Sequence, residues 1–333
     1  MSIPVVAFFN NKGGVGKTSL VYHLAWMCSI SSIRILAVDL DPQANLTAAF
    51  LEDERLEELW DDSDQSQTIF GFLSPLIRGV GDIRSPECEV VEDNLALVVG
   101  DLNLSSFEDQ LATEWPRCND GHERAFRVMS AFWRIMQDAA ESFEAELVLM
   151  DLGPNLGAIN RAALISSDYV VVPLSPDLFS LQGLRNLGPT FRRWRQEWQE
   201  RLKKGDNFPD LRLPKGQMET VGYIVLQHSV RLDRPVKAYQ KWISRIPNEY
   251  RESVLGVGSS KRVSVENDPE CLALLRHYRS LMPLAQEARK PMFSLRPADG
   301  AIGSHLQATE DAHRDFLRLA KKIVNKVGVP WSV

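Results

Sequence analysis

A glycine-rich segment near the start of the chain restricts its fold more than any other feature. Residues 10–19 read NNKGGVGKTS, and they stand between an apolar run at residues 5–10 and a stretch with helical spacing that begins at Lys17. The glycines let the backbone curl so that successive N–H groups and the helix N-terminus point at one anion. This order of elements predicts a phosphate-binding loop.

The loop matches the pattern GxxxxGK[ST] when its first glycine is relaxed, with Lys12, Gly13, Gly14, Gly16, Lys17 and Thr18 in the positions that follow. In this pattern the Lys17 ammonium reaches the β- and γ-phosphates of a nucleotide, and the Thr18 hydroxyl ligates magnesium. The residues expected to surround the phosphates are Gly13, Gly14, Val15, Gly16, Lys17, Thr18 and Ser19.

Short apolar runs, rich in β-branched residues, predict the strands of a sheet. Most of them are continuous rather than alternating, as in strands that are buried on both faces of a parallel sheet. Segments with helical spacing lie between them, including 17–29 and 123–143. We therefore expect an α/β fold, a doubly wound and mostly parallel sheet flanked by helices, in a single domain over residues 1–333. The runs are 5–10, 34–41, 95–100, 146–153, 169–175 and 221–228.

Several classes of protein are disfavoured by patterns that the sequence lacks. It has no run of eighteen apolar residues and no signal-peptide pattern, so we expect a cytoplasmic protein without stable membrane insertion. The four cysteines are widely spaced and form no CxxC, which disfavours a disulfide scaffold and a zinc or iron–sulfur site. The six histidines show no paired metal-ligand spacing.

The loop resembles the deviant Walker A box KGGVGKT[ST] of the ParA/MinD family of P-loop ATPases, most closely the ParA-type partition ATPases. Residues 12–19, KGGVGKTS, carry this resemblance. It implies a P-loop NTPase fold, Mg²⁺-dependent hydrolysis of ATP and an ATP-dependent homodimer. It also implies that Lys12 contacts ATP across the dimer, on the partner's phosphates, much as an arginine finger does. Lys12 and Lys17 are therefore expected catalytic residues.

Two further segments extend the resemblance. The segment VDLDPQANLT, residues 38–47, resembles the second Walker-type box of the family and implies that Asp39 lies near the magnesium and that Asp41 orients the attacking water. The segment LVLMDLGPNLG, residues 147–157, resembles Walker B with the switch that follows, and implies that Asp151 binds magnesium through water.

The remaining similarity covers most of the chain. Residues 169–187 and 281–323 are similar to segments of partition ATPases, and Gln227 falls near the position where relatives contact adenine. The switch departs from the DxPP of many relatives, because Gly153 stands before Pro154.

Charge is distributed unequally along the chain. Residues 1–184 hold 11 Lys and Arg against 28 Asp and Glu, a net charge of −17, whereas residues 185–333 hold 27 against 16, a net charge of +11. The acidic, turn-rich stretch at about 52–93 is expected to be a surface excursion. The positive second half indicates an anionic partner.

A basic helical segment at about 188–217 is the candidate contact for that partner. Residues 191–204 place an apolar stripe, typical of a core face, opposite a group of basic side chains. Such side chains suit phosphate contacts without sequence readout, as partition ATPases make on chromosomal DNA. The stripe is Phe191, Trp194, Trp198 and Leu202, and the candidate DNA contacts are Arg192, Arg193, Lys203 and Lys204.

Two classes of function stay open on the sequence alone. The first is a slowly hydrolysing, DNA-binding switch of the ParA type for plasmid or chromosome partition or a related positioning task, associated with the nucleoid and activated by a ParB-like or other protein. The second is a ParA-like switch that regulates a protein partner without binding DNA. A variant of the second is MinD-like membrane association through the amphipathic segment 312–327, although such a stripe is usually a core face.

Overall fold

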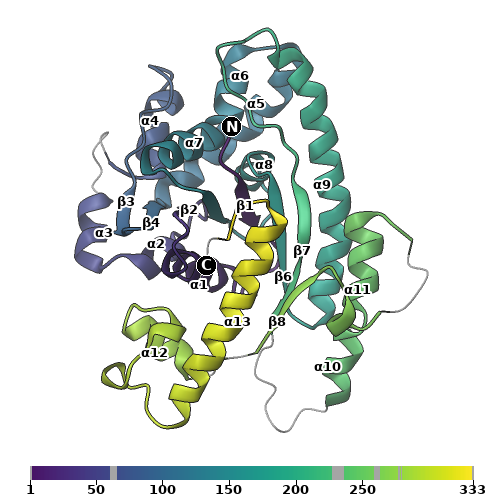
Figure 1. Cartoon of the computed structure of the whole chain (residues 1–333). Coiled ribbons are helices and arrows are strands. Elements are labelled where there is room, and N and C mark those ends of the chain that lie inside the picture. Colours follow the sequence, from purple (N-terminus) through teal and green to yellow (C-terminus); the bar gives the residue numbers. More distant parts are fainter. Residues whose placement is uncertain are drawn as a thin grey trace.

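The predicted apolar runs form the centre of one twisted sheet. The computed structural model describes residues 2–60, 66–226, 236–258, 263–276, 278 and 280–331, and within them an eight-stranded sheet has the order β3-β4-β2-β5-β1-β6-β7-β8 (Figure 1). Neighbouring strands are parallel except β3 and β4. The doubly wound, mostly parallel α/β fold is confirmed. The strands are β1 Val5–Phe8, β2 Ile35–Asp39, β3 Glu89–Glu92, β4 Leu95–Val98, β5 Leu147–Asp151, β6 Tyr169–Leu174, β7 Glu219–Leu226 and β8 Cys271–Leu275.

The two edge strands, β3 and β8, were not predicted from the sequence. β3 is four residues long and antiparallel to β4, and its residues alternate between half-buried and exposed. β8 has only β7 as a neighbour. β3, EVVE, is short and partly exposed, so its apolar pattern is weaker than that of a central strand, whereas β8, CLALL, is a continuous apolar run that was not recognised as a strand.

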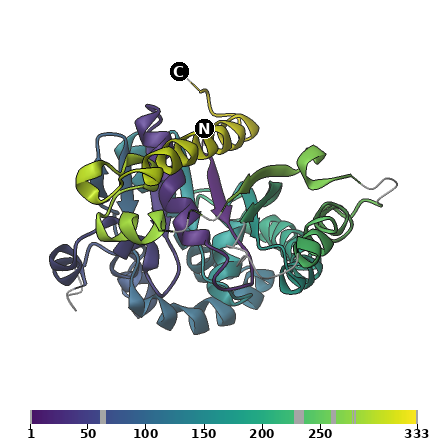
Figure 2. The same cartoon turned by 90° about the horizontal axis from the view of Figure 1, so that it is seen from below.

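The central strands are apolar throughout because helices cover both faces of the sheet. In β1, Val5 and Ala7 belong to one core cluster, whereas Val6 and Phe8 belong to the other. Figure 2 shows the C-terminal helices in yellow and lime on one side of the sheet and the blue-green helices on the other. The first cluster contains residues of α4 Ile69–Arg78, α5 Glu108–Arg117, α6 Glu123–Met129, α7 Ala131–Phe143, α8 Ala158–Ile165, α9 Leu178–Gly205, α10 Val236–Ile243 and α11 Ile246–Glu249. The second contains residues of α1 Lys17–Ile30, α2 Asn45–Phe50, α3 Asp53–Leu59, α12 Leu281–Glu287 and α13 Ser304–Lys326.

The acidic stretch 52–93 lies only partly at the surface. The acidic residues of α3 are all exposed, but α4 is packed into the core through Ile69, Phe72, Leu73 and Leu76. These four positions have the spacing i, i+3, i+4, i+7 of a helix with one buried face. This part of the expected excursion therefore belongs to the fold. The helix predicted over 123–143 is divided at Ser130 into α6 and α7.

Two amphipathic helices bury the apolar stripes that the sequence showed. In α9, Phe191, Trp194 and Trp198 are buried and Leu202 is half-buried, and the helix ends at Gly205, so residues 206–217 are not helical. In α13, the stripe from Ala312 to Ile323 packs in the second cluster, which removes the apolar face that membrane attachment would need. Among the described residues, no helix is long and apolar enough to span a bilayer.

Candidate nucleotide site

The glycine loop joins β1 to α1 with a backbone that favours glycine. Gly14 and Gly16 have φ of 69° and 84°, in the left-handed region, and Gly16 is the N-cap residue of α1. Asn10, buried before the loop, donates from Nδ2 to the Pro173 carbonyl at 2.6 Å, and its Oδ1 accepts the Lys12 N–H at 3.0 Å. The loop is therefore fixed to β6, and the open N-terminus of α1 faces the space above it.

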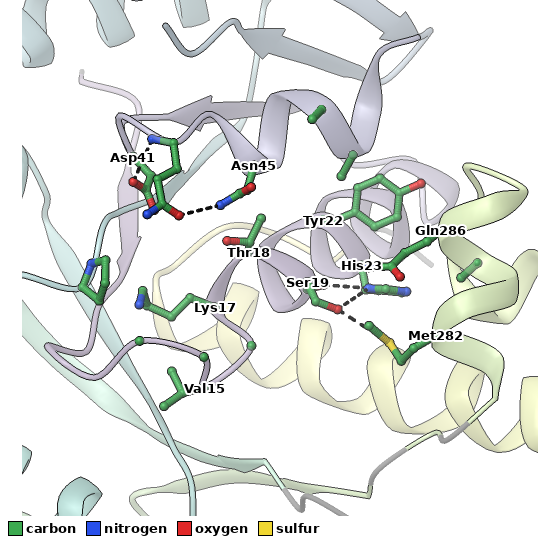
Figure 3. Close-up of a pocket in the computed structure, with 18 of the residues that line it drawn as sticks. Val15, Lys17, Thr18, Ser19, Tyr22, His23, Asp41, Asn45, Met282 and Gln286 are labelled. Carbon is green, nitrogen blue, oxygen red and sulfur yellow. Dashed lines mark hydrogen bonds between the residues drawn. The ribbon is translucent and has the colours of Figure 1, made fainter. Parts of the chain in front are cut away.

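A cavity of about 720 Å³ begins at this loop and runs along α1 to α2 and α12. Figure 3 shows Lys17, Thr18 and Asp41 toward one end of it, and His23, Met282 and Gln286 toward the other. Its volume is in the range of small-ligand sites. The structure brings all the predicted phosphate-loop residues except Lys12 to its wall, together with one predicted carboxylate. The lining comprises residues 13–19, Tyr22, His23, Asp41, Gln43, Asn45, Ala48, Ala49, Pro154, Met282, Ala285, Gln286 and Arg289.

Buried charges of both signs lie at the phosphate end of the cavity. Asp151, at the end of β5, is fully buried, and within the described part of the chain neither of its carboxylate oxygens has a hydrogen-bond partner. Burial raises the pKa of Asp151 to about 8, and Asp39, its register partner on β2, adds to the increase. Burial lowers the pKa of Lys17, whereas Asp151 and Asp41 oppose that shift. An added cation close to these carboxylates would favour their charged forms.

Magnesium fits this donor set as an ion that arrives with a nucleotide. No group of three or more His, Cys, Asp or Glu side chains among the described residues could hold a metal by itself. Mg²⁺ commonly uses one or two carboxylates and completes its shell with water and substrate phosphates. The unpartnered, buried Asp151 and the Thr18 hydroxyl would be the protein's contribution, and the ion would neutralise phosphate charge.

Asp41 lies where a catalytic carboxylate is expected. It lines the cavity with 8% of its surface exposed, and its Oδ1 accepts the Gln43 N–H at 3.1 Å. It also packs directly on Gly153, because a Cβ added to that glycine would lie 3.2 Å from Asp41 Oδ1. Glycine at position 153 thus leaves room for the Asp41 carboxylate.

Asp39, which was predicted to lie near the magnesium, has different contacts from those of Asp151. Like Asp151, it is fully buried and does not line the cavity, but its oxygens have hydrogen-bond partners. Its Oδ2 accepts the Thr47 N–H at 2.8 Å and the Thr47 hydroxyl at 2.9 Å, while Oδ1 accepts the Asp41 N–H at 3.2 Å. The carboxylate therefore holds the turn that carries Asp41. Sequence reasoning missed Thr47 because its hydroxyl acts between Asp39 and the Gly100 N–H, 53 residues away.

Lys12 lies outside the cavity wall and forms an ion pair with Asp177. Asp177 is the N-cap of α9, where its Oδ1 accepts the Ser180 N–H at 2.9 Å. The pattern Asp-x-x-Ser at the start of a helical stretch was the signal for this cap. Both side chains are partly exposed, Lys12 at 27% and Asp177 at 35%, so the pair can open.

The candidate DNA residues have unequal surroundings. Arg193, Lys203 and Lys204 are exposed on α9, as predicted for a basic outer face. Arg192 instead donates from Nη1 to the carbonyls of Ser253 and Val254 at 2.9 and 3.1 Å, which reduces its capacity for a phosphate. The candidate adenine contact, Gln227, lies outside the described residues.

Comparison with known proteins assigns the chain to a family. The profile of a family described as an AAA domain matches residues 3–204. The chromosome partitioning protein ParA of Caulobacter vibrioides is 27% identical over 199 residues, which cover 60% of this chain and 66% of that protein. The chain belongs to the ParA/MinD family of P-loop ATPases.

Solved structures show the same fold over the full chain. Protein DIP2308 of Corynebacterium diphtheriae has a TM-score of 0.72 at 21% identity and covers 98% of this chain and 99% of that one. A Cyanothece McdA variant in complex with ATP has a TM-score of 0.61 at 14% identity and covers 100% and 99%. The part of this chain that aligns with the first curated relatives spans between 42% and 81% of each relative's length.

Proposed function

We propose that this chain is an ATP-dependent switch of the ParA type that hydrolyses ATP slowly and dimerises when ATP is bound. One observation carries the proposal: the glycine loop, Lys17 and Asp41 share one cavity, with the unpartnered Asp151 buried close to Lys17. Parallel strands bring their carboxyl ends to one edge of a sheet, which is why loops after β1, β2 and β5 meet there. The Cyanothece McdA complex, which contains ATP, supports the choice of nucleotide.

In this proposal the chain's own groups position the nucleotide and the attacking water. The loop N–H groups and the α1 N-terminus hold the phosphates, and the Lys17 ammonium contacts the β- and γ-phosphates. The Asp41 carboxylate, which accepts the Gln43 N–H and lies beside Gly153, orients the water. Positioning and charge stabilisation suffice for slow phosphoryl transfer.

Lys12 would act on the partner protomer. It does not line its own cavity, and its ammonium is paired with Asp177 at the start of α9. Opening that partly exposed pair would let Lys12 contact phosphates across a dimer without competing with Lys17. The position of Lys12 outside the cavity of its own protomer therefore supports a role in trans.

DNA is the proposed partner of the ATP-bound dimer, which places the protein on the nucleoid. The support is the exposed basic set Arg193, Lys203 and Lys204 on α9, although Glu200 is exposed on the same helix. Basic side chains of this kind contact DNA phosphates and give little sequence preference. A ParB-like or other protein activator follows from the family resemblance.

The test compares wild type with Asp41→Ala under four conditions, with and without ATP–Mg²⁺ and with and without duplex DNA. Light scattering should show an ATP-dependent dimer that persists in Asp41→Ala because that variant cannot orient the attacking water. DNA binding should accompany the dimer. Only monomers of Asp41→Ala with ATP would refute the dimer model. A dimer that ignores DNA at low salt would favour the switch that regulates a protein partner.

A further inference from the structure

We propose that Glu108 is a positioning residue for ATP hydrolysis, because it fixes the loop on which the Asp41 carboxylate rests. The inference depends on the proposed ATPase function. Glu108 lies at the start of α5, 67 residues from Asp41, and outside the cavity lining. Its effect passes through α8 and the loop 153–157, which links β5 to α8.

Glu108 caps the N-terminus of α8 from another helix. Its Oε1 accepts the Ala158 N–H, and its Oε2 accepts the Ile159 N–H at 2.8 Å. A carboxylate there satisfies two of the otherwise unpaired amides and interacts favourably with the helix dipole. Gly157 permits this approach, because a Cβ at that position would lie 2.5 Å from Glu108 Oε1.

The first turn of α8 in turn holds the loop beneath Asp41. The Asn160 side chain, 1% exposed, donates from Nδ2 to the Gly153 carbonyl at 2.9 Å and to the Asn155 carbonyl at 2.7 Å. Gly153 is the residue against which Asp41 packs. A shift of the start of α8 would therefore move the backbone that supports the Asp41 carboxylate.

A second contact between α5 and α8 keeps Glu108 in place. The Arg161 guanidinium of α8 lies over the Trp115 ring of α5, 4.5 Å from its centroid. Arg201 of α9 donates from Nε to the Trp115 carbonyl at 3.0 Å. Because Trp115 joins the later part of α5 to both α8 and α9, Glu108 holds α8 from a packed helix rather than from a mobile loop.

The decisive variant is Glu108→Gln, which keeps the size of the side chain but replaces one acceptor oxygen with an NH₂ group. It cannot accept from both Ala158 and Ile159, so the loop 153–157 should loosen while the glycine loop stays intact. We expect kcat for ATP to fall about tenfold, the effect typical of lost outer-shell support. The Kd for ATP should change less than about twofold. Amide hydrogen exchange of residues 153–160 should become faster.

Asp109→Asn is the matched control, because it removes an exposed carboxylate from the adjacent position of the same helix. It should leave kcat, Kd and exchange unchanged. Glu108→Asp, whose shorter side chain keeps the charge, should have an intermediate kcat. It replaces Glu108→Gln in the test if that variant unfolds. The inference is overturned if Glu108→Gln behaves as Asp109→Asn, or if Kd weakens in the same proportion as kcat falls. A wild-type chain without ATPase activity would refute the proposed function itself.

Discussion

Acidification should destabilise this protein through one buried histidine, His23. The side chain is 3% exposed and stacks on Phe316 with ring centroids 5.1 Å apart. Its Nδ1 lies 2.6 Å from the Ser19 carbonyl, which can only accept, so Nδ1 carries the proton, and Nε2 is a buried acceptor with no partner among the described residues. Burial lowers the pKa of His23 to about 4.

The magnitude follows from the difference between the folded and unfolded pKa values. The unfolded histidine has a pKa of about 6.5, so between that value and about 4 the unfolded chain binds more protons than the folded one. The free energy of unfolding therefore falls as the pH falls. From pH 7 to pH 5 the loss due to His23 alone is about 2 kcal/mol.

The assay is urea unfolding at both pH values for wild type and His23→Phe. Phenylalanine keeps the ring contact with Phe316 but does not titrate, and the lost hydrogen bond to Ser19 costs about 1 kcal/mol at either pH. Wild type should lose about 2 kcal/mol more than the variant between pH 7 and pH 5. The exposed His122, changed to Gln, is the control and should behave as wild type. Equal losses in wild type and His23→Phe would refute the reasoning.

Three further predictions concern the phosphate loop, the basic helix and the core. Lys17→Ala should weaken ATP binding about a hundredfold, because a hydrogen bond to a charged group contributes about 2 to 3 kcal/mol; wild-type affinity in a fluorescent-nucleotide titration would remove Lys17 from the site. Arg193→Glu should weaken DNA binding about tenfold or more in a filter assay at low salt while ATP-driven dimerisation persists; loss of both would indicate a folding defect instead. Trp198→Ala should lower the free energy of unfolding by about 3 to 5 kcal/mol, since Trp198 is fully buried, stacks on Trp115 and donates to the Pro214 carbonyl at 2.9 Å; a loss below about 1 kcal/mol by urea unfolding would contradict this packing.

The sequence by itself determined the features that depend on neighbouring residues. The glycine loop is readable because Gly14 and Gly16 adopt positive φ locally, between an apolar run and a helix. The central strands are readable because burial on both faces makes each run continuous, as in Val5 to Phe8. The buried stripe of α9 is readable from its helical spacing. Such patterns span only a few residues.

Tertiary structure alone decided which partner each charged side chain has. Asp39 and Asp41 are two residues apart. The Asp39 carboxylate accepts from Thr47, whose hydroxyl in turn accepts the Gly100 N–H, whereas Asp41 lines the cavity. The pairing of Lys12 with Asp177 spans 165 residues. The hydrogen bond from the Ala158 N–H to Glu108 joins residues that are 50 positions apart in the sequence. Contacts at such separations depend on strand order and helix packing, which bring distant carboxylates and amides together without leaving any periodic pattern in the chain.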